Sequence, residues 1–129
     1  MSPSAKLNKT LKPTASQRGK RYEKLAEEYL INKGFRILER NWRFGRKEID
    51  LIALKEKTII FVEVKGCRTG QFGHPTGRVD RRKRQNLIGA AEKFIIEKNI
   101  TDSDFRFDLI TFLGGNLEYY RDAFPGNEE

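Results

Sequence analysis

The chain has 129 residues, enough for one domain that buries about two-thirds of its unfolded surface around a single core. Its one cysteine excludes an internal disulfide and is typical of a reducing cytoplasm, and no apolar run approaches the roughly 20 residues that span a bilayer. The 26 basic residues exceed the 18 acidic ones, and the formal charge of +8 favours a polyanionic partner, such as nucleic acid or an anionic membrane face. The sequence therefore predicts a cytoplasmic protein with no secretory signal and no membrane span.

The composition divides the chain into three parts. Residues 1–15 combine Lys and Pro with small polar residues and carry no acidic residue, so they are expected to form a disordered basic arm. Residues 16–122 are expected to form a single domain, because neither a repeat nor a second boundary interrupts them. Residues 123–129 are expected to form a flexible tail.

The first half of the domain is predicted to contain one helix and three strands. Apolar residues that recur three and four positions apart indicate a helix from Ser16, and Gly34 is its predicted stop. Strands are predicted over residues 35–42, 48–54 and 58–64, with FGRK as the first turn and KEK as the turn of a hairpin.

The second half begins with a glycine-rich loop over residues 66–77, which is expected to be mobile or functional. Asp80 is the predicted cap of a second helix, which carries an apolar stripe. Strands over residues 105–113 and 117–121 follow, joined by GGN. The order of helix, three strands, helix and two strands predicts an α/β fold with its sheet between helices.

Charged residues interrupt the run FVEVK, in which Glu63 and Lys65 stand two apart among good strand residues. If the hairpin turns around residues 56–57, residues whose numbers sum to about 113 face each other. Asp50 then faces Glu63 at about 5 Å between Cβ atoms, and Lys65 points to the same face. Two close carboxylates repel, and a hard cation such as Mg²⁺ relieves that repulsion. Such an ion would hold a phosphate and activate water, while Lys65 would stabilise the charge that develops.

The same residues have a simpler interpretation. The pattern E-x-K occurs often by chance, and Glu63 and Lys65 on an exposed strand end would merely pair with neighbouring charges. The assumed register is also a choice, because a slip of one residue would send Asp50 to the opposite face of the sheet. Both alternatives remain open at the level of spacing alone.

Several segments together resemble a known family. EID at Glu48 to Asp50 and FVEVK at Phe61 to Lys65 resemble the D…(D/E)-x-K core of the restriction-endonuclease-like nuclease superfamily. More narrowly, the chain is similar to the YraN-like family of bacterial proteins in that superfamily. The similarity extends from Tyr22 to Ile110, through YEKLAEEYL, GFRILERNWR, EIDLIA, FVEVKGCR, FGHP, VDRRKRQNLIGAAEKFI and RFDLI. It implies a restriction-endonuclease-like αβββαβ core with a mixed central sheet flanked by helices.

The resemblance also implies a site. Asp50, Glu63 and the backbone carbonyl of Val64 would hold Mg²⁺, or Mn²⁺ in its place, and Lys65 would be the catalytic lysine. Glu23 matches a helix glutamate that often completes such sites, and it borders the apolar stripe of its helix. The alternative for Glu23 is a solvated helix residue paired with a nearby lysine.

A basic run, RVDRRKR at residues 78–84, stands at the predicted start of the second helix. Cations there oppose the helix dipole by roughly 0.3–1 kcal/mol each, and phosphate binding would offset that cost. Lys83 and Arg84 continue the inward stripe of this helix, so they are expected to face the same end of the sheet as the carboxylates. A solvated charge run is the alternative. The residues predicted to contact nucleic acid are Arg78, Arg81, Arg82, Lys83 and Arg84.

Five further residues are of types that could have a function. His74 in the glycine-rich loop would serve as an acid, base or ligand, although a lone loop histidine is more often a bystander. Asp108 is expected to make structural hydrogen bonds. Trp42 and Phe72 would stack on bases, or else belong to the core and anchor the loop. Cys67 is assigned no catalysis, because no base accompanies it.

Three functions follow from these features. The leading hypothesis is a metal-dependent nuclease acting on DNA. Similarity to archaeal Holliday junction resolvases points to branched substrates and to a homodimer with two active sites, by analogy of fold. The second hypothesis is a nucleic-acid-binding or assembly module that keeps the nuclease fold without turnover. A module docking on anionic lipid or an acidic protein has little support, because no strongly amphipathic basic helix is predicted.

Overall fold

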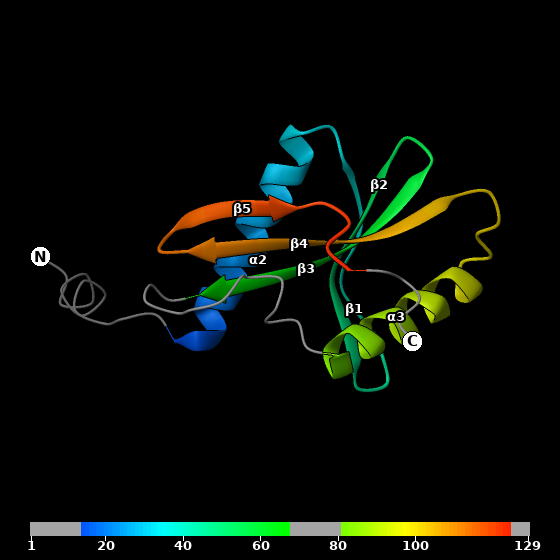
Figure 1. The fold of residues 1–129 in the computed structure, drawn as a ribbon, viewed down its shortest axis with the longest axis horizontal. Helices are drawn as coiled ribbons and strands as arrows, with labels where there is room; N and C mark the ends of the chain where they lie inside the picture. Colours follow the sequence, from blue (N-terminus) through cyan, green and yellow to red (C-terminus); the bar gives the residue numbers. More distant parts are fainter. Residues whose placement is uncertain (1–13, 68–80, 125–129) are drawn as a thin grey trace, which may run out of the picture.

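The structure, a computed structural model, describes residues 14–67 and 81–124. The helices and strands in these ranges are α2 Ala15–Asn32, β1 Arg36–Phe44, β2 Lys47–Lys55, β3 Thr58–Cys67, α3 Arg81–Glu97, β4 Asp104–Leu113 and β5 Asn116–Tyr120. The strands form one five-stranded sheet in the order β1-β2-β3-β4-β5, in which only β3 and β4 run parallel (Figure 1). The predicted α/β fold is confirmed, and the element order is consistent with the restriction-endonuclease-like αβββαβ core, with β5 added at one edge.

Local sequence signals set both ends of α2. Thr14 caps its start: the Thr14 hydroxyl accepts a hydrogen bond from the Gln17 amide at 3.1 Å, and the Gln17 side chain accepts one from the Thr14 amide at 2.8 Å. The helix ends at Asn32, and Gly34 follows with a φ of +92°, a conformation that favours glycine. The predicted stop at Gly34 is therefore confirmed.

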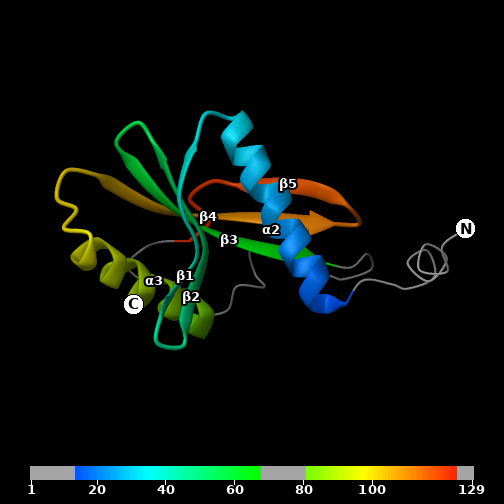
Figure 2. The ribbon, with the colours of Figure 1, turned by 180° about the vertical axis from the view of Figure 1, so that it is seen from behind.

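The two helices cover opposite faces of the sheet, as the two views show (Figures 1 and 2). α2 buries Ala26 and Leu30 against one face, whose other core residues are Phe35, Leu51, Ala53, Ile60, Val62, Ile110 and Phe112. α3 covers the other face with Leu87, Ala90, Ala91 and Phe94, against Ile49, Ile52, Ile59, Phe61, Phe107, Leu109 and Phe124. Within the described ranges, no helix is both long and apolar enough to cross a membrane.

The strands β1 to β4 are all longer than the sequence predicted, and the extensions of β1 and β3 are set by their pairing. Phe44, which was assigned to a turn, pairs with Lys47, so the turn between β1 and β2 contains only residues 45 and 46. β3 continues past the predicted end at Val64 to Cys67, because its parallel pairing with β4 continues to Leu113. Residues that local composition assigned to loops are thus held in strands by their partners.

Several predictions lie outside the described residues and stay predictions. These are the basic arm up to residue 13, the loop residues Phe72 and His74, the helix cap at Asp80, the cation Arg78 and the tail from residue 125.

Candidate active site

The sheet divides into two arms at the predicted site. β2 and β3 pair from Lys55 with Thr58 to Leu51 with Val62, in the register that the hairpin predicted. Beyond these pairs β2 continues to Lys47 alongside β1, whereas β3 continues to Cys67 alongside β4. We call this divergence the fork; in Figure 1 the β1–β2 turn points towards the start of α3 while β3 and β4 run in another direction.

Asp50 lies at the fork, next to the last pair between β2 and β3. Its Oδ2 accepts a hydrogen bond from the backbone amide of Val64 at 2.8 Å. The carboxylate thus provides the acceptor that a neighbouring strand would otherwise supply. Ile49 and Ile52 both belong to the α3-side core although they are three residues apart, so strict alternation is interrupted on either side of Asp50.

Glu63 brings a second carboxyl group to Asp50. The Glu63 side chain is only 5% exposed, and the two carboxyl groups lie close enough to share a hydrogen bond. Burial, the charge of Glu63 and that hydrogen bond raise the pKa of Asp50 to about 9, although the Val64 amide opposes the shift. The predicted pairing of carboxylates across the hairpin is therefore present.

Lys83 of α3 is the cation in contact with this pair. Its Nζ lies 2.9 Å from Oε2 of Glu63. Burial lowers the pKa of Lys83, but the charge of Glu63 and the hydrogen bond to it outweigh burial, so the pKa is raised. The expectation that Lys83 faces the carboxylates is confirmed. Lys65, by contrast, is half-buried on β3 beside Thr111 of β4, and its amine has no hydrogen bond to any residue in the described part of the chain.

Glu23 reaches the edge of the site from α2. Its Oε1 accepts a hydrogen bond from the side-chain amide of Asn41 at 3.2 Å. Burial raises the pKa of Glu23, and the charges of Glu48 and Glu63 raise it further, against the opposing charge of Lys20. Glu23 is therefore close to the pair electrostatically, but its hydrogen bond is to Asn41 of β1.

Asn41 is a residue that the sequence analysis missed. It lies within β1 at a φ of +50°, in the left-handed region where asparagine is enriched. Asparagine is otherwise uncommon in strands, so its presence in the run FRILERNW was the available signal.

The donor atoms at the fork suit a hard divalent cation. They are the two carboxylates, to which the resemblance adds the carbonyl of Val64, and Mg²⁺ commonly binds one or two carboxylates while keeping several waters. A cation would also offset the repulsion between Glu63 and Asp50 that contributes to the raised pKa of Asp50. Across residues 14–67 and 81–124, however, no three Asp, Glu, His or Cys side chains converge as a ready cluster. A metal here would therefore depend on waters and the backbone for its remaining ligands.

A small cleft of about 180 Å³ opens beside Asp50, between the β1–β2 turn and α3. It is lined by Arg46, Lys47, Glu48, Asp50, Lys83, Asn86 and Leu87. Arg81 and Arg82 are exposed at the start of the same helix, and Arg84 is half-buried. The cleft thus joins the acidic pair to a cationic rim.

Two of the other residues considered earlier are structural. Asp108 is fully buried and accepts hydrogen bonds from Nε of Arg106 at 3.0 Å, from the hydroxyl of Tyr119 and from the amide of Asp122 at 2.8 Å. Trp42 packs edge-on against Phe94, with 5.5 Å between the ring centroids. The predicted structural role of Asp108 is confirmed, and Trp42 belongs to the core.

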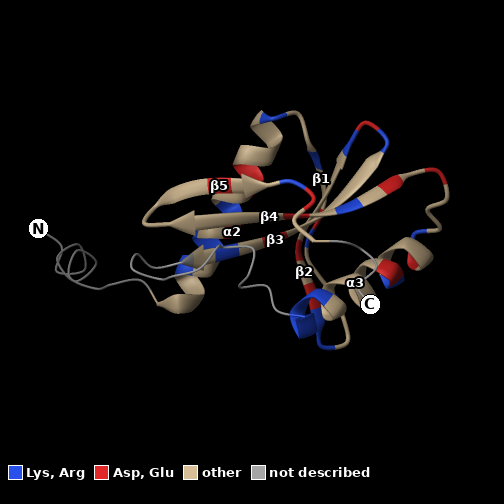
Figure 3. Ribbon diagram, viewed as in Figure 1, with Lys and Arg blue, Asp and Glu red and all other residues tan. Residues whose placement is uncertain are grey.

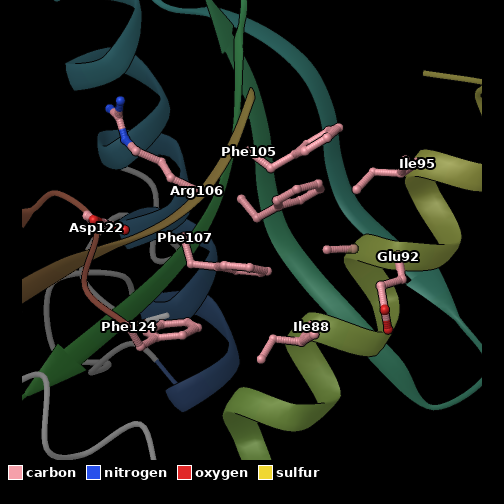
Figure 4. Close-up of a pocket in the computed structure, with 10 residues that line it drawn as sticks. Ile88, Glu92, Ile95, Phe105, Arg106, Phe107, Asp122 and Phe124 are labelled. Carbon is pink, nitrogen blue, oxygen red and sulfur yellow. The ribbon is translucent and has the colours of Figure 1, made fainter. Parts of the chain in front are cut away.

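A second cleft, of about 370 Å³, lies between α3 and β4 and contains none of the predicted site residues. Figure 4 shows Phe105 and Phe107 of β4 facing Ile88 and Ile95 of α3, with Arg106 directed away from the rings. Its lining is mainly apolar, which distinguishes it from the charged fork.

Comparison with known proteins places the whole of this site within one family. A model of the uncharacterised protein family UPF0102 matches residues 22–112. The chain belongs to this family. A UPF0102 protein of Fusobacterium nucleatum is 39% identical over 110 residues, which cover 85% of this chain and 92% of that protein. A UPF0102 protein of Clostridioides difficile is 47% identical over 88 residues, covering 68% of this chain and 77% of that protein. The UPF0102 match confirms the family recognised in the sequence, and neither name specifies an activity.

Proposed function

We propose that this protein is a metal-dependent nuclease that hydrolyses phosphodiester bonds in DNA. The observation that supports the proposal is the meeting of Asp50 and Glu63 at the fork, where Glu63 is buried and Asp50 is half-buried. A protein gains no stability from crowding two carboxyl groups in this way. Such an arrangement is typical of a binding or catalytic site.

Each group at the fork would have a separate role in such a site. Asp50, Glu63 and the carbonyl of Val64 would hold Mg²⁺ or Mn²⁺, which when bound polarises a phosphate and lowers the pKa of a bound water. The Val64 amide fixes the Asp50 carboxylate, and the ion pair with Lys83 positions the carboxylate of Glu63. Lys65, next along β3, would stabilise the negative charge that develops on the phosphate.

Nucleic acid is the substrate class that the surrounding charge favours. Arg81 and Arg82 are exposed beside the cleft at Asp50, and cations of this kind contact phosphates without reading base sequence. Glu23 would orient a water or complete the ligand set from α2.

A non-catalytic nucleic-acid-binding or assembly module is the second candidate. One observation favours it: Lys83 already neutralises Glu63 at 2.9 Å, an arrangement that is stable without any metal. Such a module would bind nucleic acid in a salt-dependent manner, without a metal requirement, and Asp50→Ala would leave the affinity unchanged.

The decisive experiment is a cleavage assay with Mg²⁺ or Mn²⁺ on labelled single-stranded, duplex, flap and four-way-junction DNA and on RNA. Wild type is compared with Asp50→Ala, Lys65→Ala and Asp102→Ala, the last removing an exposed carboxylate from the loop before β4. Calorimetric titration with Mn²⁺ on the same proteins gives a readout independent of turnover. Sedimentation of the free and DNA-bound protein tests the expected homodimer.

We expect metal-dependent cleavage by wild type and Asp102→Ala, a loss of at least about 100-fold in the other two variants, and loss of Mn²⁺ binding in Asp50→Ala only. A wild type that binds the panel but cuts nothing, with affinity unchanged by Asp50→Ala, would reject the nuclease in favour of the module. Preference for junctions over linear duplex would extend the proposal to branched DNA.

A further inference from the structure

The exposed side of α2 carries three cations next to the candidate active site. Lys20, Arg21 and Lys24 are all exposed, and we call them the α2 basic face. Lys20 lies one helical turn before both Lys24 and Glu23, the residue through which α2 reaches the fork. Its charge is close enough to lower the pKa of Glu23 against the stronger effects of burial and neighbouring carboxylates. The α2 basic face is therefore adjacent to the site, although the sequence analysis did not include it.

Two of these cations act on neighbouring carboxylates of α2 through their charge, Lys20 on Glu23 and Lys24 on Glu27. Two other exposed arginines are paired, Arg40 with Glu27 at 2.6 Å and Arg43 with Glu48 at 3.2 Å. Among the residues that the structure describes, neither a hydrogen bond nor an ion pair joins the side chains of the α2 basic face to a partner. Like charges one turn apart, such as Lys20 and Lys24, destabilise a helix. An external anion would remove that repulsion.

The acidic pair lies between this face and the cations of α3. α2 is fixed at the fork by Tyr22, whose ring stacks on Phe112 with 4.7 Å between centroids, and α3 is fixed there by the bond between Lys83 and Glu63. Figure 3 shows the basic starts of both helices in blue, with the acidic positions of β2 and β3 between them. A polyanion bound at one group would thus pass the carboxylates on its way to the other.

We infer that the α2 basic face is a second phosphate-contact surface, and that a nucleic-acid duplex lies across the fork between it and the start of α3. The inference rests on the proposed function, which it extends by naming the surface and the strandedness of the ligand. Duplex is favoured because the available contacts are cations, whereas single-strand binders rely on aromatic platforms. In the described part of the chain the exposed aromatic side chains are Phe44, which is covered by the amine of Lys93 at 5.3 Å, and Phe105, which stacks on Phe61.

The test is fluorescence anisotropy with a labelled 30-base-pair duplex and the matching single strand, on the full chain without divalent metal, over a range of salt concentrations. The triple variant Lys20→Ala, Arg21→Ala, Lys24→Ala is compared with Arg36→Ala, Lys57→Ala, Lys98→Ala. The control removes the same three charges from exposed positions at the other end of the sheet and α3. Circular dichroism verifies that both variants keep their helices.

We expect the α2 variant to lose about 10- to 100-fold in duplex affinity at low salt, and its slope of log affinity against log salt to fall by about 2 to 3. The control should change affinity by less than about 3-fold with an unchanged slope. Equal losses of affinity in both variants would mean that only the net charge of the protein matters, and this result would overturn the inference. Weakened single-strand binding with intact duplex binding would overturn it as well.

Failure of the inference and failure of the proposed function are distinguishable. If wild type cleaves DNA and the α2 variant binds the duplex as wild type does, only the second surface is lost. If wild type binds no nucleic acid at all, the proposed function and the inference both fail.

Discussion

At the scale of single residues, the raised pKa of Asp50 makes the stability of the folded protein depend on pH. This raised pKa means that the folded protein keeps a proton on Asp50 up to about pH 9, while the unfolded chain releases it near pH 4. Between these values the folded state binds more protons, so the free energy of unfolding falls as pH rises. Stability from this group is fully present only below the unfolded pKa.

Asp50→Asn should therefore stabilise the metal-free protein at neutral and basic pH. The amide keeps the shape and cannot ionise, so we expect urea unfolding in EDTA at pH 8 to show a gain on the order of 2 to 4 kcal/mol over wild type, and little gain at pH 4. Asp102→Asn serves as the exposed control, with no pH-dependent difference. A variant less stable than wild type at pH 8 would contradict the destabilising role of Asp50.

Thr111 offers a simpler test of polar burial. Its side chain is 1% exposed, and its Oγ1 has no hydrogen-bond partner among residues 14–67 and 81–124. Thr111→Val keeps the volume and removes an unsatisfied hydroxyl, so the free energy of unfolding should rise by about 1 kcal/mol. Thr101→Val, at an exposed position, should change it by less than about 0.5 kcal/mol. Destabilisation by Thr111→Val in urea unfolding would mean that the hydroxyl makes a bond after all.

The sequence predicted some of these residues better than others, for physical reasons. The contact of Lys83 with the carboxylates followed from helical periodicity, because Leu87 continues the same inward stripe. Asn41 was missed because its role depends on a left-handed backbone inside a strand, which no periodic pattern indicates. The Val64 amide at Asp50 was missed too, since strict alternation predicts where side chains point and not where two strands separate.

At the scale of elements, two glycines show how the helices contact the sheet differently. A Cβ at Gly66 of β3 would lie 2.4 Å from the ring of Tyr22 on α2, a ring held in place by its stack on Phe112. A Cβ at Gly89 of α3 would lie 2.6 Å from the amine of Lys47, which is the free end of a flexible side chain. The ring of Tyr22 cannot move away from an added Cβ, whereas the amine of Lys47 can.

Gly66→Ala should therefore destabilise the protein by about 1 to 3 kcal/mol, whereas Gly89→Ala should be neutral or stabilising by up to about 1 kcal/mol. The reasons are overpacking against an aromatic ring in β3 and improved helix propensity in α3. Urea unfolding of both variants, and of Gly66→Ala combined with Tyr22→Ala, measures the difference. The cost of Gly66→Ala should shrink in the Tyr22→Ala background, and an undiminished cost would exclude the ring as its cause.

Element boundaries show where local sequence information ends. The hairpin register was predictable because a short turn at residues 56–57 fixes which residues face each other. The true ends of β1 and β3 were not, because Phe44 and Cys67 are held by pairing with Lys47 and with β4. Strand existence is thus encoded locally, while strand length depends on neighbours that lie elsewhere in the chain.

At the scale of the whole molecule, the alternation of helical and strand patterns was sufficient for the α/β layering, with α2 and α3 on opposite faces. The order of the five strands and the single parallel pair depend on long-range pairing, so composition could not supply them. The resemblance to the restriction-endonuclease-like superfamily predicted the αβββαβ order of elements in the core. The added edge strand β5, which the sequence predicted from its own pattern, completes the sheet beside β4.

The fork has a mechanical consequence. Asp50 belongs to the arm of β1 and β2, and Glu63 belongs to the arm of β3 and β4. Beyond the pairs of β2 with β3, the two arms are connected by the hydrogen bond from the Val64 amide to Asp50 and by the helices, because Lys83 of α3 contacts Glu63 and Glu23 of α2 accepts a bond from Asn41 of β1. The groups that form the candidate site are therefore also contacts that hold the two halves of the sheet together, so a substitution at the fork changes the attachment of one half to the other as well as the local chemistry.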